Sequence, residues 1–84
     1  MRYIVVPFKD RLSGIMFKNI AERKGIKGNL GPTPRSLSVS CGVCVRISLE
    51  GHDEAGKKQI MSKVQKIISE NPKWNIQGVY TMVL

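Results

Sequence analysis

The chain has 84 residues, so we expect one domain over residues 1–84, because chains divide into several domains only well above this size. Hydrophobic residues make up 42% and charged residues 24%, which is typical of a globular protein and too apolar for a disordered one; no apolar run reaches the ~20 residues of a membrane-spanning helix. The net charge of +8 suits tRNA, another nucleic acid, an acidic protein partner or solubility alone.

A strand and a helix are the first predicted elements. Residues 3–8 form a short apolar run with β-branched residues, typical of a buried strand, and Pro7 should lie near its end because it has no N–H. Apolar residues then recur at helical spacings, and the stripe expected to face the core consists of Leu12, Ile15, Met16, Ile20 and Ala21. Gly25 should end this helix, and Gly28 and Gly31 should keep the following loop flexible.

The middle of the chain, residues 36–49, alternates between polar and apolar residues and predicts two half-buried strands. A tip of three residues, 41–43, pairs polar with polar and apolar with apolar residues, whereas a two-residue tip mixes them. We therefore predict a hairpin in which Gly42 allows unusual dihedral angles. The predicted pairs are Ser40 with Cys44, Val39 with Val45, Ser38 with Arg46 and Leu37 with Ile47.

A second helix and a last strand complete the chain. Asp53 and Glu54 open the helix, and Asn71-Pro72 ends it. Its buried stripe should be Ile60, Met61, Val64, Ile67 and Ile68. Residues 74–84 are expected to form the final strand, with Trp74, Ile76, Tyr80 and Met82 on one face.

The predicted order of elements is strand, helix, strand, strand, helix, strand. This order is the split βαβ, or ferredoxin-like, α+β arrangement, with a four-stranded antiparallel sheet and both helices on one face. The opposite face of the central hairpin should then carry serines, Cys44 and Arg46.

A motif in residues 31–42, GPTPRSLSVSCG, is the most specific feature of the sequence. The PTPR segment, the spaced SCG and the following apolar strand with Arg46 together resemble a family of selenium/sulfur carrier-like proteins, from the first strand to about His52. The resemblance implies that Cys41 is the carrier thiol and that Arg35 is the arginine of the PTPR motif. It also implies that the protein holds sulfur or selenium on Cys41 as a persulfide or selenosulfide. Such a protein is a carrier more than a self-sufficient enzyme, and it uses no cofactor.

The chemistry of a carrier requires a thiolate, and a free cysteine with a pKa of about 8.5 is mostly protonated at neutral pH. Positive charge on Arg35 and Arg46 would favour the anion, the Gly42 N–H would be open to the sulfur, and Ser40 could add a hydrogen bond. The alternative for Cys41 is a small buried residue at the end of a strand. Both arginines could equally be solvated surface charges.

A second cysteine, Cys44, creates a Cys-Gly-Val-Cys spacing. A redox CxxC normally precedes a helix that lowers the pKa of its first thiol, whereas a strand follows here. Cys44 could resolve a persulfide on Cys41 by forming a disulfide and releasing sulfide, or it could be an inert small residue. Cys41, Cys44 and His52 supply three ligands where a structural zinc site needs four, so we predict no metal site.

The expected partners differ between the possible functions. A carrier needs a donor, such as a cysteine desulfurase, and an acceptor protein. A basic RNA- or tRNA-binding module is the alternative, although ferredoxin-like sheets bind RNA through aromatic residues and the predicted open face of the hairpin has none. A structural or regulatory subunit, including a homodimer, is a third reading because the core is small. Residues 1–10 lack the features of a signal peptide, so we expect a cytoplasmic protein that does not bind membranes.

Overall fold

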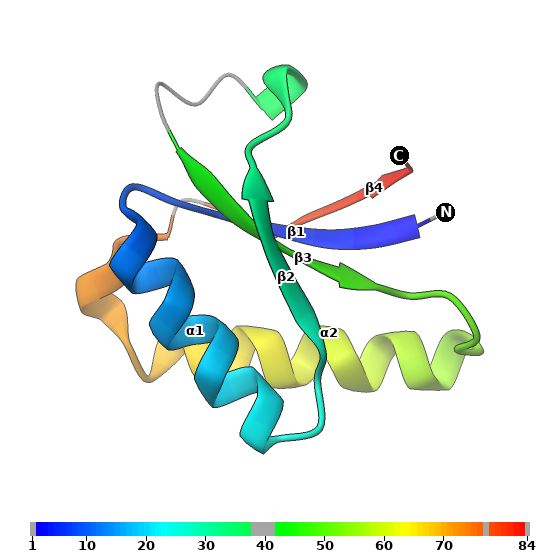
Figure 1. Ribbon diagram of the computed structural model, residues 1–84. Coiled ribbons are helices and arrows are strands. Elements are labelled where there is room, and N and C mark those ends of the chain that lie inside the picture. Colours follow the sequence, from blue (N-terminus) through cyan, green and yellow to red (C-terminus); the bar gives the residue numbers. More distant parts are fainter. Residues whose placement is uncertain (1, 38–41, 77, 84) are drawn as a thin grey trace.

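The computed structural model describes residues 2–37, 42–76 and 78–83, apart from the side chain of Arg35. These residues form a four-stranded antiparallel sheet in the order β2-β3-β1-β4, with two helices on one of its faces, which confirms the predicted ferredoxin-like α+β arrangement (Figure 1). In chain order the elements are β1 (Arg2–Phe8), α1 (Arg11–Arg23), β2 (Gly28–Pro32), η1 (Arg35–Leu37), β3 (Val43–Ser48), α2 (Glu54–Ser69), η2 (Pro72–Trp74) and β4 (Tyr80–Val83). No helix in the described ranges is long and apolar enough to cross a bilayer.

Both helices begin at an aspartate that caps their first turn. Asp10 accepts a hydrogen bond from the Ser13 N–H at 2.8 Å, and Asp53 accepts one from the Gly56 N–H at 2.7 Å. Helix α1 ends before Gly25, whose φ of +82° lies in the left-handed region, as the sequence predicted.

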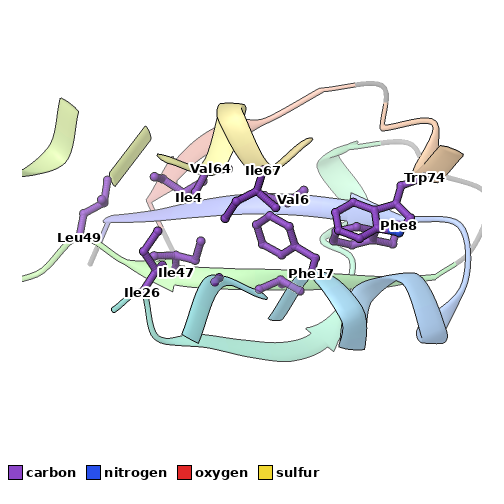
Figure 2. Packing of buried hydrophobic residues seen from close by; sticks show 12 residues of the cluster. Ile4, Val6, Phe8, Phe17, Ile26, Ile47, Leu49, Val64, Ile67 and Trp74 are labelled. Atoms are coloured by element: carbon purple, nitrogen blue, oxygen red, sulfur yellow. The ribbon is translucent and has the colours of Figure 1, made fainter. Parts of the chain in front are cut away.

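The core lies between the helices and one face of the sheet. Alternate residues of β1 and β3 point into it, and α2 contributes Val64 and Ile67, with Ile60, Met61 and Ile68 packed at its border as expected. Three aromatic rings meet at one end of the core (Figure 2): the ring centroids of Phe8 and Phe17 lie 5.4 Å apart, and the Trp74 ring lies 5.9 and 6.0 Å from them. Trp74 belongs to the 3-10 turn η2, and the predicted final strand is wrong over residues 74–76 and 78–79, because β4 begins only at Tyr80.

Helix α1 confirms the predicted stripe at Ala21, which is buried, and at Ile20, which packs against the core, but not at Leu12 and Met16. Its buried residues are Gly14, Phe17 and Ala21, whereas Leu12 is 66% exposed and Met16 37% exposed. The reason is the close approach of the helix to the sheet: a Cβ atom at Gly14 would lie 3.0 Å from Leu30 Cδ2. Small side chains therefore allow the contact, and Phe17 fills the space beside it.

The partner of β3 also differs from the prediction. Strand β2 is formed by Gly28–Pro32, where a flexible loop was expected, and Leu37 belongs to the 3-10 turn η1. The observed register pairs Leu30 with Val45, Gly31 with Cys44, Asn29 with Arg46 and Gly28 with Ile47. The predicted pair of Leu37 with Ile47 is therefore wrong, and Ser38, Val39 and Ser40 of the other predicted pairs lie outside the described residues. Glycine is required here because a Cβ at Gly28 would lie 2.7 Å from Val45 Cγ1.

Two substitutions in α1 test which face supports the fold. We expect Phe17→Ala to lower the free energy of unfolding by about 3–5 kcal/mol, because it empties a fully buried aromatic site. Leu12→Ala should change it by less than about 0.5 kcal/mol, because the side chain is exposed. Urea unfolding followed by tryptophan fluorescence measures both, and comparable losses in the two variants would contradict the observed orientation of the helix.

Candidate functional site

The segment between β2 and β3 contains the PTPR and SCG motifs. Its two ends are joined because the Thr33 N–H donates to the Gly42 carbonyl at 3.3 Å, one residue beyond the Pro32–Val43 pair of the sheet. The hydrogen bond closes the base of the segment and brings the PTPR motif against the glycine of SCG. Ser40, Cys41 and the side chain of Arg35 lie outside the described residues.

Gly42 occupies a position that other residues do not fit. Its φ is +133°, beyond the region near +60° that non-glycine residues tolerate, which confirms the predicted unusual backbone. A Cβ atom at this position would lie 2.8 Å from the carbonyl oxygen of Phe8. The SCG glycine therefore allows the backbone that follows Cys41 to approach the end of β1.

The carbonyl oxygen of Pro32 is a second point of convergence. It accepts a hydrogen bond from the Cys44 thiol at 3.4 Å and one from Arg46 Nη2 at 3.4 Å. The guanidinium passes beside Gly31, where a Cβ would lie 3.8 Å from Arg46 Nε, at ordinary van der Waals distance. Two side chains that the sequence predicted separately, Cys44 and Arg46, thus meet on the PTPR backbone.

Two buried polar atoms at this base have no hydrogen-bond partner among the described residues: Thr33 Oγ1 and Arg46 Nε. Thr33 Oγ1 lies 3.7 Å from the position of a Cβ on Gly42, next in the chain to Cys41. The sequence reasoning missed Thr33, although its place between the two prolines of the PTPR motif was a visible signal. Both atoms carry polar hydrogens that could stabilise an anion.

Cys44 lies on the face of the sheet that points away from the helices, together with Arg46 and Ser48, as predicted. Its thiol is nevertheless fully buried and free of any disulfide. The strand pairing places Tyr3 of β1 and Tyr80 of β4 on this same face of the sheet. The rings of Phe8 and Trp74 lie in the core, on the opposite face.

A cleft of about 400 Å³ opens at the far end of β3, between the end of α1 and the start of α2. His52 lines it, together with Lys27, Lys63 and Glu50, so charges of both signs border it. Within the described ranges, no three His, Cys, Asp or Glu side chains come together as metal ligands. These mixed charges do not favour one class of ligand. The cleft is also separate from the base of the motif segment.

Gly42→Ala tests the requirement for glycine at the base of the segment. We expect it to lower the free energy of unfolding by about 2 kcal/mol or more, because the added Cβ meets the Phe8 carbonyl at a forbidden φ. Gly51→Ala is the matched control: its φ is +81° but no atom lies within 4 Å, so a loss of about 1 kcal/mol is expected. Equal losses by urea unfolding would show that the contact with Phe8 is unimportant.

Thiol labelling tests the burial of Cys44. In a Cys41→Ser variant the remaining thiol should react slowly with a water-soluble disulfide reagent in the native protein and fast in denaturant, because it is fully buried. Labelling of the native variant as fast as that of the unfolded chain would contradict this.

Comparison with known proteins agrees with the motif. A family model described as "Putative Se/S carrier protein-like" matches residues 2–81, well past the end of the motif-based resemblance near His52. No curated protein and no solved structure matches the chain. Because the family model covers nearly all of the sequence, the chain belongs to the Se/S carrier protein-like family.

Proposed function

We propose that this protein carries sulfur or selenium on Cys41 and passes it to an acceptor protein. The observation that supports this best is the Thr33–Gly42 hydrogen bond, which joins the two family motifs at the base of one segment. The family match supports a Se/S carrier in general, and the assignment of the chemistry to Cys41 is our own.

The proposed transfer needs no cofactor. The Cys41 thiolate attacks the outer sulfur of a persulfide on the donor, for which a cysteine desulfurase is the expected protein. The sulfur–sulfur bond of the donor breaks, the donor cysteine leaves as a thiolate, and a persulfide forms on Cys41. An acceptor nucleophile then attacks the outer sulfur and releases the Cys41 thiolate, so the two steps leave the oxidation level of the protein unchanged. Selenium would follow the same route as a selenosulfide.

Positive charge and polar hydrogens near the base of the segment support an anionic sulfur. Arg46 is held at Pro32, and Thr33 Oγ1 lies 3.7 Å from the position of a Cβ on Gly42. We propose that these groups, with Arg35 and Ser40, lower the cost of the Cys41 thiolate and of its persulfide. The chain's net charge of +8 adds a general attraction for anions.

The sequence left two roles open for Cys44, a thiol that resolves a persulfide or an inert small residue, and we propose the second. Attack on a persulfide requires an accessible thiolate, whereas the Cys44 thiol is fully buried and donates its hydrogen to the Pro32 carbonyl. Its proposed contribution is to hold the PTPR backbone.

RNA binding has weaker support. Tyr3 and Tyr80 do face away from the helices, but Arg46 is the one cationic residue on that face of the described strands, and it is engaged with Pro32. A nucleic-acid platform requires several cations along the backbone path as well as stacking rings.

Mass spectrometry after incubation with a cysteine desulfurase and cysteine tests the proposal. We expect wild-type protein and Cys44→Ala to gain one sulfur atom that a reductant removes, and Cys41→Ser to gain none. Fragmentation should place the sulfur on Cys41. If wild-type protein gains no sulfur from the enzyme or from inorganic polysulfide, or if Cys41→Ser is loaded equally, the proposal is wrong.

A further inference from the structure

Helix α1 carries exposed apolar residues on the side opposite to its buried one. One side, with Gly14, Phe17 and Ala21, is buried against the sheet. At about 3.6 residues per turn, Leu12 and Met16 fall on the other side, and they are 66% and 37% exposed. A helix on the surface of a small domain normally turns a polar side to water.

Single exposed apolar residues are common and need no explanation. Leu12 and Met16, however, are one turn apart on the same helix, and the partly buried Ile15 lies beside them. Leu12, Ile15 and Met16 belong to the stripe of five residues that the sequence pattern assigned to the core. We call the side of the helix that carries Leu12 and Met16 the outer face of α1.

The charges of α1 and the residues flanking it are predominantly positive. Residues 9–24 contain five Lys and Arg against two acidic residues, a net charge of 5 − 2 = +3. Both acidic residues are already engaged: Asp10 caps the helix, and Glu22 pairs with Lys18. The cationic groups Arg11, Arg23 and Lys24 therefore have little local compensation.

This charge pattern selects the kind of partner. A second copy of the chain would bring two positively charged surfaces together, which opposes association. An acidic protein segment with apolar side chains would match both features. We propose that the outer face of α1 is a docking surface for an acidic amphipathic segment of another protein, whose apolar side chains pack on Leu12 and Met16.

The location of this surface gives it a functional context. Helix α1 begins shortly after Phe8, and the Phe8 carbonyl touches the position of Gly42 at the base of the motif segment. A protein bound at the start of α1 would therefore lie at the same end of the sheet as that segment. Docking is nevertheless independent of the proposed carrier function and can be tested without it.

The test uses a synthetic helical peptide with leucine on one side and glutamate on the other, titrated into ¹⁵N-labelled protein and followed by NMR. We expect the largest shift changes in α1, around residues 11–16, and an affinity that falls as salt is added. Leu12→Glu should weaken binding tenfold or more. Leu12→Gln should weaken it less, because only the apolar contact is lost.

Val83→Glu is the matched control. Val83 is 72% exposed on β4, so this variant introduces the same charge at an equally exposed apolar site outside α1. It should bind the peptide within about twofold of wild type, since rim charges distant from a contact have small effects. Both substituted sites are exposed, and a dispersed NMR spectrum verifies folding.

Three results would overturn the proposal. The first is no binding of the acidic peptide at millimolar concentration, or shift changes centred outside α1. The second is equal binding of a peptide with lysine in place of glutamate. The third is a dimer in size-exclusion chromatography that Leu12→Glu abolishes, which would assign the outer face to a second copy of the chain.

Discussion

The contact between Gly42 and the carbonyl of Phe8 connects the fold with its motif segment. Gly42 follows Cys41, precedes β3 and accepts the hydrogen bond of Thr33, so β1, β2 and β3 all meet at this residue. A side chain there would separate the end of β1 from the base of the segment. Glycine is thus needed in the SCG motif for the close approach of two backbones, independently of any chemistry at the neighbouring thiol.

Glycine has a related role along β2 and α1. Gly28 lies against Val45, and Gly14 lies against Leu30, so small residues bring the edge strand and the helix close to the same part of β3. This close packing has a consequence on the far side of the helix. Because α1 packs on the sheet through Gly14, Phe17 and Ala21, the side chains of Leu12 and Met16 lie on its solvent side.

Much of the fold could be predicted from the sequence, because β1 is a short apolar run and β3 and α2 turn one apolar side to the core. Strand β2 could not, since its sequence, GNLGP, has low strand propensity, and its place in the sheet depends on tertiary pairing with β3, where Gly28 fits against Val45. The face of α1 was ambiguous for a similar reason: a pattern with two apolar sides does not say which one is buried. At the site, the motif identified Gly42 and Arg46, but convergence on the Pro32 carbonyl depends on the β2–β3 register, which the sequence pattern misassigned.

A carrier has to meet a donor and an acceptor in turn, and this limits how strongly it can bind either of them. An outer face made of two apolar side chains and a positive border fits that limit. Its apolar contact is far smaller than a stable interface needs, so complexes should dissociate fast. The positive charge acts at longer range and raises the rate of encounter more than the lifetime of the complex. The proposed sulfur chemistry and the proposed docking surface therefore involve different residues, although both lie at the same end of the sheet, where Phe8 connects the motif segment with the start of α1.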